Sequence, residues 1–290
     1  DFGEYGRRVE SELGIFSEAN LSSYFLIVQD ILRFCHGKGY LTGPGRGSAA
    51  GCMVSYLIDI TQIDPVQYGL VFERFYNAGR NTAGRISMPD IDIDVPKEAR
   101  KSIIDYVSNK YGSGNVAQII TFQTLKGRAS LKRVMQSRGN ISFDEQNAIT
   151  QSIMDESKIA DELQDMKEEL GESSIVLWAL KNKKEKLKEW CEIGEDGKLE
   201  GRMAKVFEQA VRLEGTKIIQ SKHAAGVVIS PQPISQACPM VRSTDKEDKN
   251  LLAGFEGPSC EDVGLLKLDV LGIRMLDKIM EVPKILKNGV

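Results

Sequence analysis

The sequence predicts a mixed α/β protein in which one domain is interrupted by a block of helices. Segments with strand-like alternation occur at 88–96 and 115–122 and return at 223–230 and 264–272, whereas residues 123–214 have an almost entirely helical pattern. The 290 residues suit one large domain or two ordinary ones. We therefore expect the helical block to be inserted between two parts of a single α/β domain.

The elements before and after the first strand are expected to be helical. Residues 7–39 predict two helices, of which the second has apolar residues at helical spacing and ends in a glycine-containing stretch. The glycine-rich segment 43–51 predicts a turn, and residues 52–60 predict a buried helix. Residues 97–112 predict a helix that ends at Gly112.

Composition excludes several classes of protein. Hydrophobic residues make up 41% of the chain, enough for a sizeable core, and the net charge of −3 excludes a protein that is basic over its whole surface. No apolar run approaches the roughly 20 residues needed to span a bilayer, so we expect no membrane partner. The first residues lack both Met and the apolar stretch of a signal peptide, so we expect the chain to begin inside a longer protein or after a removed tag.

The cysteines do not predict a metal or redox site. The five cysteines are scattered, no pair has Cys-x-x-Cys spacing, and the chain has only two histidines. We expect reduced thiols in a cytoplasmic protein.

Charge is strongly segregated along the chain. The segment from Lys97 to Arg138 contains nine basic and two acidic residues, and the segment from Asp144 to Glu200 contains sixteen acidic residues and eight lysines. In the basic segment, Arg128 and Lys132 are four residues apart, which places them on one helix face where they could bind nucleic-acid phosphates. A solvated helix face with no ligand is the alternative and the commoner explanation of a charge run, and we expect solvated helices in the acidic segment.

Three alternating carboxylates indicate a metal site. On a strand, Asp90, Asp92 and Asp94 share one face. Two ionised carboxylates about 6 Å apart repel by roughly 3 kcal/mol at an effective dielectric near 20, so the strand requires a compensating cation, and Mg²⁺ suits hard oxygen ligands. A calcium loop is disfavoured because Val95 stands where that loop needs glycine. A solvent-facing acidic edge strand remains the alternative.

A second strand contains a further candidate ligand. Lys267 and Asp269 share one face of the predicted strand at 264–272, opposite apolar neighbours. An aspartate in an apolar strand needs a partner, and a metal shared with the Asp90 strand would provide one. An ordinary Lys–Asp pair on an exposed sheet face is the alternative.

The glycine-rich turn has features of a phosphate-binding loop. Gly43, Gly45 and Gly47 alternate and are followed by Ser48, without the spacing of a Walker or dinucleotide loop. Glycines let backbone amides approach a ligand, Ser48 is placed to cap the next helix, and Arg46 adds positive charge. A plain connecting turn is the alternative. In the same domain as a carboxylate strand, the loop favours phosphoryl or nucleotidyl transfer.

The order of these motifs identifies a family. The segments GPGRGSAAG, FERFYN, MPDIDID, QIITF, KHAAGVVIS and GLLKLDVLG together resemble the α subunit of bacterial DNA polymerase III, the replicative family C polymerase, from about Ser22 to Leu276. The resemblance implies a mixed-sheet palm of the polymerase-β-like nucleotidyltransferase type with an inserted all-helical thumb. The expected bounds are 1–121 and 216–290 for the palm and 122–215 for the thumb.

The resemblance also implies roles for individual residues. Asp90, Asp92 and Asp269 match the catalytic ligands of two Mg²⁺ ions, whereas Asp94 is not counted among them. The remaining matches are nucleotide contacts, at Gly47, Ser48, Arg74 and Lys267. Arg46 is added to these expected nucleotide contacts for the positive charge that it gives the loop. Two departures from the family pattern are Val95-Pro96, where an aromatic residue is usual, and the long stretch 77–87.

The expected function is template-directed DNA synthesis on primer–template DNA from deoxynucleoside triphosphates. The thumb residues Arg128, Lys132 and Arg133 would bind the duplex backbone, and replisome subunits would bind regions absent from this sequence. The family's fingers are also absent, so the alternative is a catalytically silent DNA-binding fragment. A metal-dependent phosphohydrolase would need a water-activating base, and only His36 and His223 could titrate near neutral pH.

Overall fold

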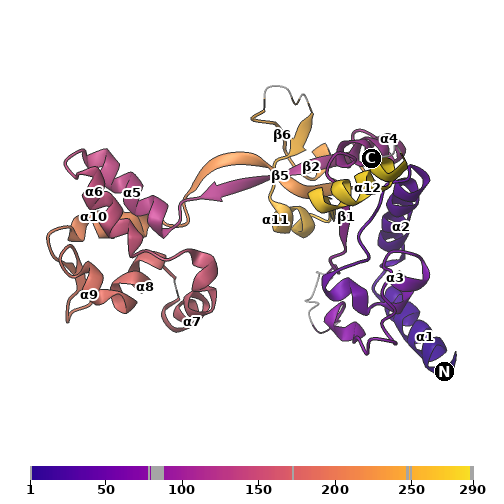
Figure 1. Ribbon diagram of the computed structural model, residues 1–290, viewed down its shortest axis with the longest axis horizontal. Helices are drawn as coiled ribbons and strands as arrows, with labels where there is room; N and C mark the ends of the chain where they lie inside the picture. The colour runs from indigo at the N-terminus through magenta and orange to yellow at the C-terminus, as the bar shows by residue number, and fades with distance from the viewer. Residues whose placement is uncertain are drawn as a thin grey trace. The chain divides into compact units, whose positions relative to one another are not determined.

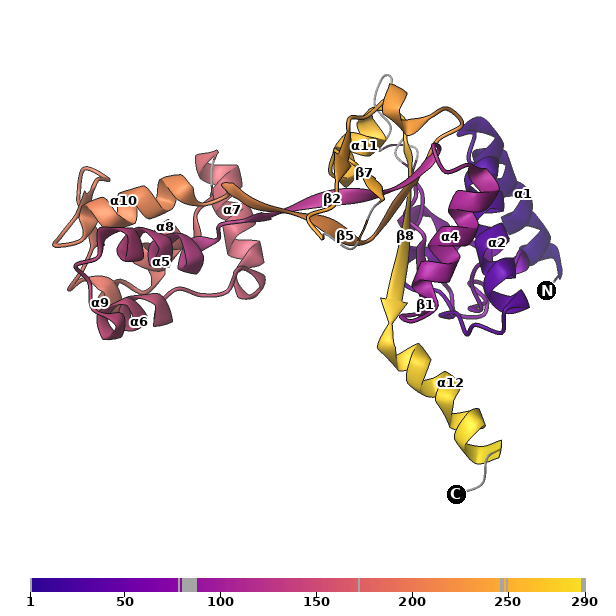
Figure 2. The same cartoon turned by 90° about the horizontal axis from the view of Figure 1, so that it is seen from above.

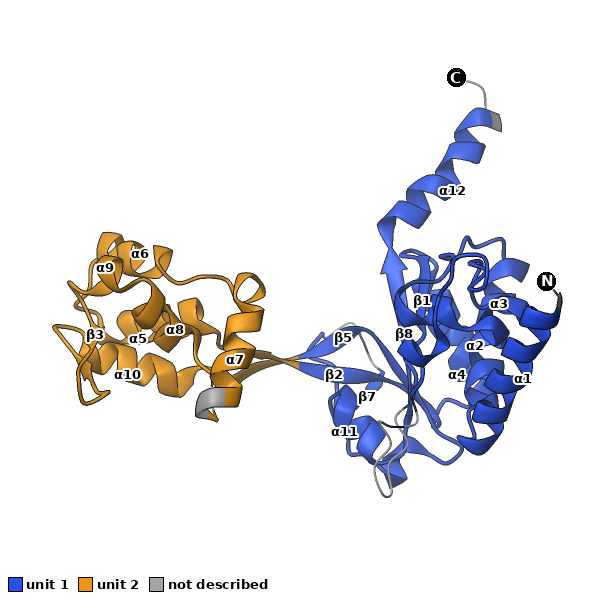
Figure 3. Ribbon diagram, turned by 90° about the horizontal axis from the view of Figure 1, so that it is seen from below, with its two compact units in different colours: residues 1–121, 221–290 blue, residues 122–220 orange. Residues whose placement is uncertain are grey.

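The computed structural model describes residues 2–77, 79, 88–171, 173–245, 248 and 250–287. It divides the chain into two compact units, unit 1 with residues 1–121 and 221–290 and unit 2 with residues 122–220 (Figure 3). The unusually long stretch noted above, 77–87, lies almost entirely outside the described residues.

Unit 1 is built around a mixed sheet. Among the described residues, six strands lie in the order β1-β8-β5-β2-β7-β6. Their bounds are Asp92–Pro96 for β1, Leu266–Ile273 for β8, Lys217–Ile229 for β5, Val116–Thr124 for β2, Leu251–Ala253 for β7 and Met240–Arg242 for β6. β1 is parallel to β8, whereas β5 is antiparallel to β8. The chain passes from unit 1 into unit 2 within β2 and returns within β5.

Helices cover one face of this sheet beside β1 and β8 (Figure 2). They are α1 (Phe2–Glu18), α2 (Ser22–Gly37) and α4 (Arg100–Tyr111), and their apolar residues form a core with the buried faces of the strands. Because Ile91, Ile93 and Val95 point into this core, the intervening aspartates emerge on the opposite face, as the alternation predicted.

Several expected elements differ in length. The helix after the glycine-rich segment, α3, covers only Met53–Leu57, because Asp59 takes a positive φ of 60° and turns the chain away. Two 3₁₀ turns flank it in sequence, η1 (Gly47–Gly51) and η2 (Phe72–Arg74). Helix α4 ends at Gly112, which adopts φ 101° as only glycine does readily.

The last part of unit 1 contains elements that the sequence did not reveal. A 3₁₀ turn, η5 (Ile234–Gln236), precedes the short strands β6 and β7, and helix α11 (Gly257–Asp262) follows them. These elements enclose a small separate core against β2 and β5. Helix α12 (Arg274–Lys287) leads to the C-terminus (Figure 1) and follows β8 in sequence. Its Asp277 accepts hydrogen bonds from the backbone amides of Lys97 and Glu98.

Unit 2 has its own apolar core. Its helices are α5 (Gly127–Arg138), α6 (Phe143–Gln151), α7 (Ala160–Leu170), α8 (Ile175–Asn182), α9 (Lys184–Leu187) and α10 (Ala204–Leu213), with a 3₁₀ turn, η4 (Glu156–Lys158). Leu131, Ile149 and Phe207 are fully buried among them.

The prediction of an all-helical insertion was wrong. Unit 2 includes the ends of β2 and β5 and also contains a hairpin of two short strands, β3 (Glu192–Ile193) and β4 (Leu199–Glu200). Its turn forms because Gly197 adopts φ 79° and the Asp196 carboxylate accepts a hydrogen bond from the Lys198 amide at 3.0 Å, a typical Asp-Gly turn.

Among the described residues, no helix is both long enough and apolar enough to cross a membrane.

Candidate metal centre and phosphate loop

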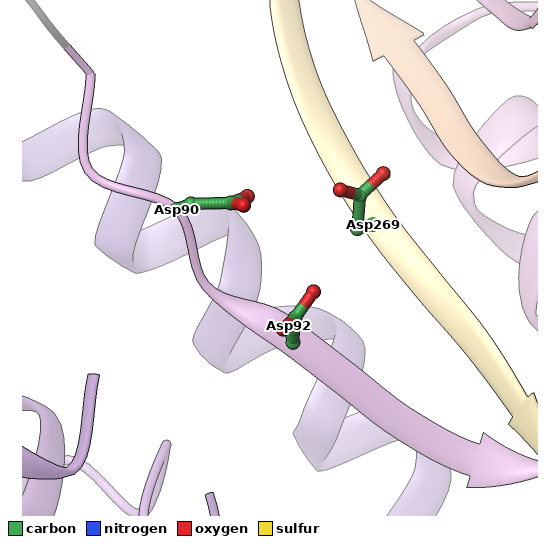
Figure 4. A group of neighbouring side chains, drawn as sticks. All are labelled: Asp90, Asp92 and Asp269. Atoms are coloured by element: carbon green, nitrogen blue, oxygen red, sulfur yellow. The ribbon is translucent and has the colours of Figure 1, made fainter. Parts of the chain in front are cut away.

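Three carboxylates meet on the sheet face opposite the helices. In the parallel register of β1 and β8, Asp92 lies opposite Asp269, so the two side chains emerge side by side, and Asp90 precedes β1 by two residues. One oxygen from each of the three lies within 4.8 Å of the other two. Figure 4 shows Asp92 and Asp269 on neighbouring strands and Asp90 on the segment just before β1, with the three side chains around one space.

Lys267 partly balances this negative charge. Its Nζ donates to Asp269 Oδ2 at 2.6 Å and lies 3.9 Å from Asp90 Oδ1. Burial works against a charged lysine, but the hydrogen bond to Asp269 and the charges of both aspartates outweigh it, so the pKa of Lys267 is raised. Loss of surrounding water raises the pKa of Asp90, against the lowering effect of Lys267. The three carboxylates carry more negative charge than the two nearby cations, Lys267 and Arg46, can neutralise.

The donor set fits a hard divalent cation. Asp269 is 9% exposed, and its Oδ1 is buried with no hydrogen-bond partner in the part of the chain that the structure describes. An unpaired buried carboxylate oxygen is costly, and a cation placed among the three carboxylates would satisfy it. The ligands are all oxygen, as Mg²⁺ or Mn²⁺ prefers. Among the described residues, this is the one group of three or more acidic, histidine or cysteine side chains close enough to share an ion.

Asp94 connects the carboxylate strand to the glycine-rich loop. Its backbone oxygen accepts a hydrogen bond from the Gly43 amide at 3.0 Å, and a Cβ atom at Gly43 would lie only 2.7 Å from Asp94 Cβ. Arg46 Nε lies 3.1 Å from Asp92 Oδ2 and 3.6 Å from Asp94 Oδ1. Asp94 therefore faces the loop and is not part of the three-carboxylate group.

The glycines of the loop serve different structural purposes. A Cβ atom at Gly45 would lie 2.6 Å from Thr61 Cγ2, and one at Gly51 would lie 2.7 Å from the Val71 carbonyl oxygen. Gly47 differs, because it has φ 59° and a Cβ atom there would meet no atom of the described residues within 4 Å. Its backbone is thus open to a ligand, whereas Gly43, Gly45 and Gly51 permit close packing.

The expected cap by Ser48 was wrong. Ser48 is exposed within η1, and Arg46 occupies the position before that turn. The turn begins early because Gly47 can adopt a positive φ. Helix α3 is capped instead by Cys52, whose Sγ accepts a hydrogen bond from the Ser55 amide at 3.3 Å.

The other basic residues that were expected to contact nucleotide or DNA do not share the surroundings of Lys267 and Arg46. Arg74 is exposed at the end of η2 in unit 1. In unit 2, Arg128 donates to the Ile153 carbonyl oxygen at 2.7 Å, Lys132 Nζ lies 5.8 Å from the centre of the Phe143 ring, and Arg133 is exposed.

Sequence reasoning missed residues that support the site from behind. The Tyr24 hydroxyl accepts a hydrogen bond from the Ile91 amide at 2.9 Å and so fixes the backbone between two of the carboxylates. Arg8 and Glu12 contact the loop that follows Ser48. The four-residue spacing of Arg8 and Glu12 was a visible signal for an ion pair, but their burial against the loop could not be read from it.

Comparison with known proteins gives consistent matches along the chain. Residues 2–272 match the family model described as the bacterial DNA polymerase III alpha NTPase domain. This chain is also similar to proteins named DNA polymerase III subunit alpha. The one from Campylobacter jejuni is 38% identical over 98% of this chain, the one from Aquifex aeolicus 34% identical over 99%, and the one from Bacillus subtilis 36% identical over 98%. The chain spans 21%, 24% and 23% of these relatives, respectively.

We expect the chain to bind Mn²⁺, a Mg²⁺ substitute visible by electron paramagnetic resonance, through this carboxylate group. Asp92→Asn and Asp269→Asn should each weaken binding at least about tenfold, because each removes a charged ligand. Asp105→Asn, which removes the same charge from helix α4, should leave binding within about twofold. Equal Mn²⁺ affinity in all four proteins would rule out a metal centre here.

Proposed function

The chain belongs to the bacterial DNA polymerase III alpha family, and we propose that it carries the catalytic centre of template-directed DNA synthesis. In this proposal, unit 1 is a palm of the polymerase-β-like nucleotidyltransferase type and unit 2 is the thumb. The observation that supports it most is the meeting of Asp90, Asp92 and Asp269, which come from segments on either side of unit 2 in the sequence.

The proposed reaction joins the 3′-hydroxyl of a primer to the α-phosphate of a deoxynucleoside triphosphate and releases pyrophosphate. Two Mg²⁺ ions, when bound, supply a lowered pKa for the 3′-hydroxyl and neutralise charge on the departing pyrophosphate. Asp90, Asp92 and Asp269 are the residues that would hold them, because they supply oxygen ligands from three directions. The buried Oδ1 of Asp269, which has no hydrogen-bond partner among the described residues, fits this role.

The same face offers groups for the triphosphate. Lys267 is half-buried beside the carboxylates, where its positive charge can neutralise a phosphate oxygen. The open backbone at Gly47 and Ser48 offers amide donors. Arg46, within reach of Asp92 and the loop, adds a further positive charge, and Arg74 on η2 is proposed as a fourth contact.

The thumb is proposed to bind the duplex through its phosphates. Helix α5 buries Leu131, Val134 and Met135 and leaves Arg133 exposed, so the basic side chains of this helix do not form its core. Phosphate contacts position a protein on a duplex without reading its sequence, as a polymerase requires.

The alternative is a DNA-binding fragment without activity. It is motivated by length, since the chain spans only about a fifth of its Campylobacter jejuni relative. We propose that the segments needed to close the triphosphate site and to bind replisome subunits lie in the rest of a longer polymerase. Primer extension with Mg²⁺ and all four triphosphates, by residues 1–290 and by a polymerase of the relatives' length that contains them, separates the two functions.

Asp92→Asn in that longer polymerase should lower the rate of primer extension at least about a hundredfold, because one of the three carboxylates that would hold the metal ions loses its charge. Single-turnover extension of a labelled primer measures it. Asp105→Asn serves as the matched loss of one carboxylate and should extend at the unaltered rate. An Asp92→Asn polymerase with unaltered rate would show that the catalytic metals lie elsewhere.

Lys132→Ala and Arg133→Ala should each weaken binding of primer–template duplex severalfold and reduce the slope of log K against log salt by about one, because each removes one phosphate contact. Fluorescence anisotropy at several salt concentrations measures both quantities. Lys167→Ala, on the acidic helix α7, should change neither. The thumb assignment fails if neither α5 variant alters affinity or slope.

A further inference from the structure

An ion pair on α1, formed by a buried Glu12 and a partly exposed Arg8, contacts the end of the glycine-rich loop 43–51, the residues that follow it and the segment before η2. Glu12 is 1% exposed, and Arg8 lies one helical turn before it with Nε 2.6 Å from Glu12 Oε1. The proposed reaction assigns neither residue a role. Their other hydrogen bonds to described residues go to the segment that follows Ser48 and to the segment that precedes Arg74.

Glu12 holds the start of α3. Its Oε1 accepts from the Met53 amide at 3.1 Å, and its Oε2 accepts from the Val54 amide at 3.0 Å and from Cys52 Sγ at 3.3 Å. Burial, with the nearby charge of Glu12, raises the pKa of the Cys52 thiol to about 12, so this thiol remains a donor at neutral pH. The carboxylate therefore fixes three successive residues immediately after η1.

Arg8 connects the end of the loop to the segment before η2. Its Nη2 donates to the Gly51 carbonyl oxygen at 2.6 Å and to the Leu70 carbonyl oxygen at 3.1 Å. Gly51 is the last residue of η1, and Leu70 lies two residues before η2. The gap between these segments is already tight, because a Cβ atom at Gly51 would lie 2.7 Å from the Val71 carbonyl oxygen.

A buried charge is an inefficient way to stabilise a core. Removing the Glu12 carboxylate from water costs several kcal/mol, and apolar replacements of buried ion pairs are often as stable or more so. A guanidinium and a carboxylate differ from apolar side chains because their hydrogen bonds are directional. Together, Arg8 and Glu12 hold five hydrogen-bonding groups in or beside the loop at defined positions. That suits a loop whose backbone amides must face a ligand.

We propose that Arg8 and Glu12 are positioning residues that preset the loop from Gly47 to Val54, and η2 beside it, for the phosphates of the incoming deoxynucleoside triphosphate. This inference rests on the proposed function. Residues Ala49, Ala50 and Gly51 are buried against the rest of unit 1, whereas Gly47 and Ser48 are exposed. Fixing the buried end of the turn fixes the direction of its exposed end.

Steady-state kinetics of the longer polymerase test the proposal. Glu12→Gln keeps the size of the side chain but loses its charge and one acceptor. We expect its KM for deoxynucleoside triphosphate to rise about tenfold, with kcat within about twofold and KM for primer–template unchanged, because binding of the phosphates is lost equally in the ground and transition states. Glu10→Gln, on the exposed side of α1, is the matched control and should behave as the unaltered enzyme.

Arg8→Lys separates positioning from folding. Lysine keeps the charge beside Glu12 but lacks the planar fork that reaches both carbonyl oxygens. We expect KM for the triphosphate to rise as in Glu12→Gln while unit 1 stays folded. All eight tyrosines lie in unit 1 and both tryptophans lie in unit 2, so the tyrosine signal of residues 1–290 reports unfolding of unit 1 separately.

The outcomes distinguish this inference from the proposed function. If Glu12→Gln does not fold, Arg8→Lys decides, and a folded Arg8→Lys enzyme with unaltered KM for triphosphate overturns the inference. Folded variants in which kcat and both KM values change together would assign the pair a structural role only, and would also overturn it. If the unaltered enzyme and Glu10→Gln both fail to extend a primer, the proposed function fails. Hydrogen exchange of the backbone amides of residues 49–54 then tests the ion pair alone, and exchange rates in Arg8→Lys equal to those of the unaltered protein would show that the pair does not hold the loop.

Discussion

The repulsion among three carboxylates is the constraint on which the rest of unit 1 depends. Asp90, Asp92 and Asp269 present oxygens within 4.8 Å of one another, and Lys267 and Arg46 neutralise only part of their charge. Without a rigid support, such a group would move apart. The buried apolar residues between and beside the aspartates provide that support, since they anchor β1 and β8 to the helices behind.

The positions of the aspartates follow from the register of the sheet. β8 must lie parallel to β1 for Asp269 to stand opposite Asp92, and β5 pairs with β8 on its other side with Gly226 opposite Asp269. Glycine fits that position because a Cβ atom there would lie 2.5 Å from Ile119 Cδ1 and 2.8 Å from His223 Nδ1. Insertion of unit 2 between β2 and β5 leaves this arrangement intact, because both strands belong to the central sheet.

Much of the fold and of the carboxylate site could be predicted from patterns among residues close in sequence. Period-two alternation predicted that the aspartates share one strand face, and the structure buries the intervening Ile91, Ile93 and Val95 on the other. Contacts between distant segments could not be predicted: the hydrogen bonds of Arg8 and Glu12 with residues 51–54 and with Leu70 depend on how α1 packs. The local cap by Cys52 was missed because Gly47 lets the turn begin before Ser48. The β3–β4 hairpin was missed because its strands are two residues long and lie within a helical composition.

The most direct measurement is anomalous X-ray scattering from crystals of the chain soaked in Mn²⁺ with a deoxynucleoside triphosphate. The account predicts manganese bonded to oxygens of Asp92 and Asp269 together, with Asp90 as a further ligand and triphosphate oxygens completing the coordination. Manganese that binds the triphosphate away from these carboxylates, with Lys267 still paired to Asp269, would contradict it.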